Sequence, residues 1–202
     1  LTHMPLHASA PTASPESGLP ACLAMDSLER VLVGGRLNEF FHFQEAGLED
    51  LLLACHTPGD IAALVRQVLA MGLETLTFRS SGTTGEPKRC THRIEALLSE
   101  ARYWVEALPR PDTVVAHVPA CHLYGFIFTV LVPFLASARA VDASLMPSWA
   151  QELGEEAGTT WIVAPPLHYH AWHAAPLVSG SAPVLAISSS APLPEELVTR
   201  MQ

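Results

Sequence analysis

Short apolar runs alternate with amphipathic segments along the chain from residue 57 onward. The runs are rich in Val, Ile, Thr and Phe, side chains that favour strands. The segments between them repeat apolar side chains every three to four residues, which favours helices. This alternation predicts an α/β fold with a mostly parallel sheet flanked by helices.

The predicted strands span residues 73–78, 113–118, 138–141, 160–164 and 183–187, and the predicted helices span residues 57–72, 93–108, 123–135, 147–156 and 194 onward. The first helix begins at a Thr57-Pro58 pair and ends at Gly72, residues typical of those positions. In this scheme residues 79–88 form a loop that joins a strand to a helix.

Composition and charge exclude several classes of protein. The 202 residues are 49% hydrophobic and only 15% charged, which excludes a disordered polymer. A formal net charge of −9 argues against nucleic acid or an anionic membrane as the main partner. The four cysteines lie far apart without a Cys-x-x-Cys pair, so we predict neither a disulfide framework nor a zinc ribbon and expect a cytoplasmic protein.

Two segments resemble targeting or membrane elements only superficially. Residues 1–22 lack the basic and apolar regions of a signal peptide, and we interpret them as a disordered tail that starts with a cloning scar at residues 1–4. The apolar run 123–138 is shorter than the ~20 residues that a spanning helix needs. It also contains Gly125 and Pro133, so we predict a buried helix and no membrane span.

The loop that contains Lys88 carries the strongest chemical signal. Lys88 is the only lysine in the chain, and it follows a run of hydroxyl residues and two glycines, Gly82 and Gly85. Glycine lets successive backbone N–H groups point at an anion, hydroxyls add donors, and lysine adds a compact positive charge. The loop therefore predicts a phosphate site, although the same residue types also make ordinary surface turns. It is not a Walker A loop, because Glu86 and Pro87 separate Gly85 from Lys88.

Residues 81–88, Ser-Gly-Thr-Thr-Gly-Glu-Pro-Lys, resemble the phosphate-binding loop of adenylate-forming enzymes, which include acyl- and aryl-CoA ligases, luciferases and peptide-synthetase adenylation domains. Residues 118–126 resemble the family's acyl-pocket motif, and residues 187–197 resemble its adenine-lining segment. Residues 160–166 match the strand before the family's Pro-rich turn. The run that follows His122 is most similar to ligases of the aryl-polyene, or xanthomonadin, type.

The resemblance implies roles for individual residues. His122, Tyr124 and Gly125 would border the acid, with His122 and Lys88 as the catalytic pair. Residues that would hold ATP are Ser80, Ser81, Gly82, Thr83, Thr84, Gly85, Lys88, Ser189, Ser190, Ala191 and Pro192. Ser189 and Ser190 stand where the family has two glycines, which adds bulk near the base.

The implied reaction is ATP- and Mg²⁺-dependent activation of a carboxylic acid to an acyl-adenylate. The acyl group then passes to CoA or to the phosphopantetheine of an acyl carrier protein. Residues 23–202 would form a partial N-terminal domain, because the family's Tyr-Gly-x-Thr-Glu segment, ribose-binding Asp and C-terminal domain do not occur among these 202 residues. The alternative is a non-enzymatic remnant domain that binds a nucleotide or a partner and self-associates.

Ten histidines invite a metal hypothesis, and His168, His170 and His173 lie within six positions. His168 and His170 share a face only on a strand, whereas His170 and His173 share one only on a helix. We therefore predict no metal site and interpret this segment as a surface or interface turn.

The sequence makes one prediction about activity. The family's second catalytic lysine cannot lie within these residues, because Lys88 is the only lysine. The 202-residue chain should therefore show no acid-dependent pyrophosphate exchange. Clear turnover in that assay would contradict this expectation.

Overall fold

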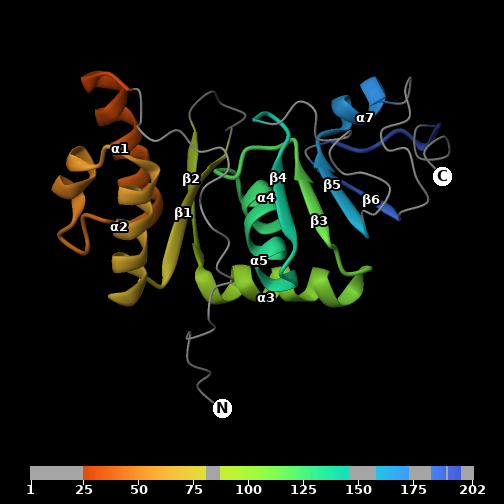
Figure 1. The fold of residues 1–202 in the computed structure, drawn as a ribbon, viewed down its shortest axis with the longest axis horizontal. Helices are drawn as coiled ribbons and strands as arrows, with labels where there is room; N and C mark the ends of the chain where they lie inside the picture. The colour runs from red at the N-terminus through yellow and green to blue at the C-terminus, as the bar shows by residue number, and fades with distance from the viewer. Residues whose placement is uncertain (1–24, 81–86, 146–157, 173–182, 190, 197–202) are drawn as a thin grey trace, which may run out of the picture. The chain divides into compact units, whose positions relative to one another are not determined.

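The computed structural model describes residues 25–80, 87–145, 158–172, 183–189 and 191–196 (Figure 1). The chain divides into two compact units, residues 1–73 and 74–202. The predicted tail 1–22, the predicted helix 147–156 and most of the helix predicted from residue 194 lie outside the described residues.

The first unit contains α1 (Ser27–Phe41), the 3-10 turn η1 (Glu49–Ala54) and α2 (Pro58–Ala70). Helix α2 confirms the prediction from Thr57. The Thr57 hydroxyl accepts the Asp60 N–H at 3.1 Å, and the Asp60 carboxylate accepts the Thr57 N–H at 2.8 Å, so both backbone donors are satisfied. The buried core of this unit consists of Phe43, Leu48, Leu52, Cys55, Leu64 and Val68.

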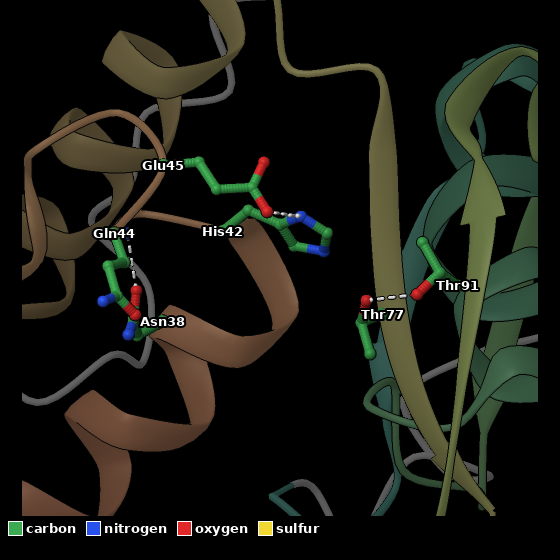
Figure 2. A network of polar contacts seen from close by, with 6 residues as sticks. All are labelled: Asn38, His42, Gln44, Glu45, Thr77 and Thr91. Atoms are coloured by element: carbon green, nitrogen blue, oxygen red, sulfur yellow. Dashed lines mark hydrogen bonds and ion pairs between the residues drawn. The ribbon is translucent and has the colours of Figure 1, made fainter.

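Helix α1 is absent from the sequence prediction. Its apolar residues show no amphipathic spacing, and Gly34 and Gly35 lower its helix propensity. The available signal was the capping box of Asp26 and Glu29, which the structure shows in full. After the helix, the Gln44 N–H donates to the Asn38 side-chain oxygen at 2.8 Å (Figure 2).

Strands β1 (Thr75–Ser80) and β2 (Lys88–Arg93) form an antiparallel hairpin in the second unit. The Thr77 and Thr91 hydroxyls are hydrogen-bonded across it at 2.8 Å (Figure 2). The prediction that residues 79–88 join a strand to a helix is therefore wrong: residues 81–87 connect two strands, and α3 (Ile94–Ala107) follows directly. Strand β2 is short and polar, so its sequence contains no apolar run from which a strand could be predicted.

A four-stranded sheet forms the centre of the second unit, with the order β4 (Arg139–Asp142), β3 (Thr113–Ala116), β5 (Thr160–Ala164), β6 (Val184–Ser188). All three pairings are parallel, and helices flank the sheet, so the predicted α/β class is confirmed. Each strand lies within two residues of its predicted bounds.

The core of this unit lies on β3 and β5. Val114, Val115, Trp161, Ile162 and Val163 are at most 1% exposed. The indole N–H of Trp161 donates to the Pro109 carbonyl at 2.8 Å, so its burial leaves no unpaired donor. Strand β5 is buried along its whole length, as expected for an inner strand of a parallel sheet.

The predicted buried helix 123–135 is confirmed, with an interruption. It consists of α4 (Leu123–Phe126), the π-helical turn η2 (Ile127–Leu131) and α5 (Val132–Ala136). Pro133 lacks the N–H that a regular α-helix would donate at this point, which fits the local π turn. No helix in the described ranges is long and apolar enough to cross a membrane.

Helix α7 (Pro166–Trp172) occupies the segment that we interpreted as a turn, so that interpretation is wrong. The segment is not a surface turn because it contains Tyr169, which is only 1% exposed. This buried side chain holds the segment after β5 against the sheet. His173 and the side chain of His170 lie outside the described residues.

His117 directly follows β3 and His168 lies in α7, the helix after β5; their ring centroids are 5.4 Å apart. Burial, and to a smaller extent the neighbouring His168, lower the pKa of His117 to about 4, while Asp142 opposes the shift. His117 is therefore neutral in the folded protein near neutral pH.

Gly125 generates the first stability prediction. A Cβ on this buried glycine would overlap the Pro119 carbonyl oxygen, which is backbone and cannot turn aside. Gly125→Ala should therefore lower the free energy of unfolding by roughly 1–3 kcal/mol in urea titrations. Gly35→Ala in α1 is the control: its Cβ would meet nothing within 4 Å, so it should be neutral or stabilising. Equal effects of the two substitutions would contradict the close approach at Gly125.

His117 generates a pH prediction. The unfolded chain binds a proton at His117 near pH 6.5, whereas the folded chain does so only near pH 4. Between these values the unfolded state holds more protons, so the free energy of unfolding falls as the pH is lowered from about 6.5 to about 4. His117→Gln should flatten this dependence by about 1 kcal/mol, a value reduced because the ring is half-exposed. His122→Gln removes an imidazole from an exposed position and is the control. If the free energy of unfolding of His117→Gln changed with pH as steeply as that of the unaltered chain, His117 would not be the residue responsible.

Candidate functional site

The candidate site lies where the parallel strands end. From β3 the chain goes to β4 on one side, and then returns past β3 to β5 and β6 on the other side. The strand order therefore changes direction between β3 and β5. In open parallel sheets, ligands bind beyond the carboxyl ends of the strands at such a switch point.

The β1–β2 hairpin carries the two ends of the predicted phosphate loop. Ser80 and Lys88 are opposite each other in the register, and the Ser80 hydroxyl donates to the Lys88 carbonyl at 3.5 Å, a long contact. Both side chains are exposed. The loop residues Ser81, Gly82, Thr83, Thr84 and Gly85 lie outside the described residues.

Positive charge is concentrated on this hairpin. Arg79 lies directly opposite Arg89, and Lys88 and Arg93 lie at the two ends of β2. This arrangement places like charges opposite each other, which does not by itself stabilise a strand pair. In a chain of net charge −9, it produces local attraction for an anion.

An aromatic contact joins the hairpin to the helix that follows His122. Phe78 is 2% exposed, and its ring centroid lies 5.5 Å from that of Phe126 in an edge-on arrangement. Phe126 is at the end of α4, and its N–H donates to the His122 carbonyl at 2.7 Å. The phosphate-loop hairpin and the predicted acid motif are thus packed together.

The predicted acid-binding residues occupy the start of α4. His122 is exposed and precedes the helix in an extended conformation. Gly125 is buried, and its carbonyl accepts the Thr129 hydroxyl at 2.7 Å. Tyr124 is half-buried, and its hydroxyl donates to the Ile187 carbonyl at 2.8 Å. Burial raises the pKa of this hydroxyl well above its ordinary value, so it remains a donor.

The contact at Ile187 brings a second predicted motif to the same place. Ile187 is in β6, and the predicted adenine-binding residues follow it directly. Ser189 is half-buried, whereas Ala191 and Pro192 are exposed; Ser190 lies outside the described residues. The structure therefore brings together the ends of the phosphate loop, the acid motif and the start of the adenine segment.

Three residues near this edge were missed by sequence reasoning. Tyr169 donates to the same Ile187 carbonyl, at 2.8 Å, and His117 and His168 lie beside each other after β3 and β5. The usable signal was their position near the carboxyl ends of predicted strands: His117 lies near the end of 113–118, and His168 and Tyr169 follow 160–164 by four and five residues. Ligands bind beyond this end of a parallel sheet.

The described residues fit a nucleotide in two respects. Ser80 and Lys88 present exposed polar groups at the loop ends, and the Ser188 hydroxyl oxygen is buried without a hydrogen-bond partner within the described ranges. A buried polar atom of this kind is normally satisfied, so it is available to a ligand. No three His, Cys, Asp or Glu side chains in those ranges are grouped to hold a metal ion, and we assign no residue to Mg²⁺.

Known proteins resemble this chain over the same region. Residues 76–202, which nearly coincide with the second unit, match the model of the AMP-binding enzyme family. A 4-coumarate–CoA ligase of Halorhodospira halophila is 37% identical over 61% of this chain and 31% of its own length. A 4-coumarate–CoA ligase of Rhodobacter capsulatus is 33% identical over 87% of this chain and 47% of its own length. The chain thus spans less than half the length of these relatives.

Solved structures share the fold. The inhibitor-bound N-terminal domain of FACL13 from Mycobacterium tuberculosis superposes with a TM-score of 0.54 at 21% identity, over 71% of this chain and 39% of that one. A malonyl-CoA ligase with methylmalonyl-CoA and AMP bound superposes with a TM-score of 0.50 at 24% identity, over 62% of this chain and 29% of that one. Because the family match covers more than half of its residues, the chain belongs to the AMP-binding enzyme family.

Proposed function

We propose that this chain carries the ATP- and acid-binding part of an AMP-forming acid–thiol ligase. The observation that carries the proposal is the convergence of three motifs through two contacts, Phe78 with Phe126 and Tyr124 with Ile187. A phosphate loop, an acid motif and an adenine segment serve one reaction only if they meet at one place.

The proposed reaction has two steps. An oxygen of the acid's carboxylate bonds to the α-phosphorus of ATP while the bond from that phosphorus to the bridging oxygen breaks, and pyrophosphate leaves. A thiolate sulfur of CoA or of a carrier-protein phosphopantetheine then attacks the acyl carbon, and AMP leaves. Positioning and neutralisation of charge supply most of the rate enhancement in such a displacement.

Each set of residues has a proposed task. The loop from Ser80 to Gly85, with Lys88, holds the phosphates, and Mg²⁺ bound with ATP would neutralise further charge there. Ser189, Ser190, Ala191 and Pro192 lie against adenine. His122, Tyr124 and Gly125 border the acid, where exposed His122 can donate to the carboxylate.

The finer assignments rest on similarity. The relatives named 4-coumarate–CoA ligase support an aryl acid as substrate and CoA as acceptor. An aryl-polyene acid, an acyl carrier protein and a cytoplasmic location are further proposals that rest on the sequence motifs and the cysteine pattern.

ATP binding tests the proposal directly. ATP at 100 times its dissociation constant should stabilise the chain by about 2.7 kcal/mol in thermal or urea unfolding. Lys88→Ala and Gly85→Val should remove most of this gain, because each disturbs the phosphate loop. Arg66→Ala, which removes an exposed positive charge from α2, should retain it. A partner-binding remnant would instead ignore ATP and self-associate, which sedimentation would detect.

A further inference from the structure

The β1–β2 hairpin presents different side chains on its two faces. Successive side chains of a strand point to opposite faces, so alternate residues share one. The ring centroid of Phe78 lies 5.5 Å from that of Phe126 in α4 and 5.9 Å from that of His92 in β2. Phe78 therefore marks the face that packs against α4. Ser80 and Lys88, the ends of the phosphate loop, lie on this same face, because Ser80 is two residues after Phe78 and pairs with Lys88.

Two arginines lie on the other face of the hairpin. Arg79 and Arg89 are directly opposite each other in the register. The Thr77 and Thr91 hydroxyls, each two residues from one of these arginines, share the face and are hydrogen-bonded at 2.8 Å (Figure 2). Arg89 and Thr91 are exposed and Arg79 is half-buried, so the face is accessible along β2. The hairpin thus separates the two arginines from Lys88, although they are close to it in the sequence.

The pair of Arg79 and Arg89 suits a phosphate group. Residues opposite each other on antiparallel strands have Cβ atoms about 4.5–5.5 Å apart, so both guanidinium groups can reach one ligand. Like charges at this separation repel each other, and an anion between them would offset the repulsion. Each guanidinium has five N–H donors in a planar fork, so a contact within the protein does not exhaust it. Two such groups match the charge and the three acceptor oxygens of a phosphate monoester.

Arg93 shares this face but has different surroundings. It lies four residues beyond Arg89, which is about 13 Å along an extended strand. Its guanidinium is 3.9 Å from the Glu95 carboxylate, which offsets its charge. Arg93 is therefore a weaker anion ligand and a matched control for the arginine pair.

The proposed reaction uses two ligands that carry phosphate. ATP is assigned to the loop between Ser80 and Lys88, on the face toward α4. CoA, the acceptor that the relatives named 4-coumarate–CoA ligase support, carries a phosphate monoester at its ribose 3′ position as well as a diphosphate. The monoester has nearly two negative charges at neutral pH, so it is the group of CoA that two paired arginines bind best. The thiol is at the far end of a long, flexible pantetheine arm, so the nucleotide and the reacting sulfur need not lie on the same face.

We propose that Arg79 and Arg89 bind the 3′-phosphate of CoA on the hairpin face opposite to the phosphate loop. The inference rests on the proposed function, because it takes CoA as the acyl acceptor. It gives the second substrate a site of its own, so that CoA and ATP do not compete for Lys88.

Calorimetry with CoA and dephospho-CoA tests the assignment in the full chain, with ATP present to occupy the nucleotide site. Dephospho-CoA lacks only the 3′-phosphate and should bind about tenfold more weakly than CoA, or weaker still. Arg79→Gln and Arg89→Gln should weaken CoA binding by a similar factor. Neither substitution should weaken dephospho-CoA binding further, because the group that these arginines contact is missing. Arg93→Gln, the control, should bind CoA within about twofold of the unaltered chain.

ATP stabilisation separates the two faces of the hairpin. Lys88→Ala should lose the stabilisation by ATP and bind CoA with unaltered affinity, whereas Arg89→Gln should keep the stabilisation by ATP. Loss of ATP stabilisation in Arg89→Gln would assign the arginines to the phosphate loop and overturn the inference.

The remaining outcomes distinguish this inference from the proposed function. Equal affinity for CoA and dephospho-CoA, or absence of CoA binding by a chain that binds ATP, would overturn the inference and leave the proposed function standing. If Arg89→Gln weakened binding of an acidic carrier protein while CoA bound normally, the face would serve a protein partner, and the inference would fail in the same way. Failure of the unaltered chain to bind ATP would contradict the proposed function, and this inference with it.

Discussion

The parallel pairing of β3, β5 and β6 is the constraint on which the candidate site depends. Their register places Ala116 beside Val163 and Ala164 beside Ser188, so three chain segments leave the sheet at one edge. Parallel strands must be linked by crossovers, and here those crossovers contain α4 and α7. Because the inner strand β5 is wholly buried, a shift of register would move apolar side chains out of the core. The energetics of the core thereby determine the geometry of the site.

Sequence reasoning succeeded where the signal was local. Runs such as 160–164 are apolar throughout because both faces of a central parallel strand are covered, and that composition is readable without knowing the neighbours. The family resemblance was likewise readable, because glycines, hydroxyls and the only lysine lie within eight positions, inside a region that matches the family model. Helix α2 was predictable from Thr57 and Asp60, because their reciprocal hydrogen bonds join residues only three positions apart.

Sequence reasoning failed where a partner far along the chain decides the structure. Strand β2 is polar and mostly exposed, and only its pairing with β1 makes it a strand. In the sequence, Tyr169 is one of several residues of a histidine-rich segment that we interpreted as a turn. In the structure, its side chain is buried, and its hydroxyl contacts the carbonyls of Ile162 and Ile187, seven and eighteen positions away. The prediction that Tyr124 borders the acid said nothing of its hydrogen bond to Ile187, 63 positions away, because that contact has no signal in the local sequence.

The two contacts that join the three motifs differ in kind, and the difference matters for how the site can work. The contact of Phe78 with Phe126 is apolar, and such contacts keep most of their energy when rings shift slightly. The hydrogen bond of Tyr124 to Ile187 is directional and weakens steeply when its angle changes. The acid motif and the adenine segment are therefore held at a set separation, while the hairpin can adjust against them. The proposed joining of a carboxylate to a phosphate would use this arrangement, since the phosphate chain must move as pyrophosphate leaves while acid and adenine stay aligned.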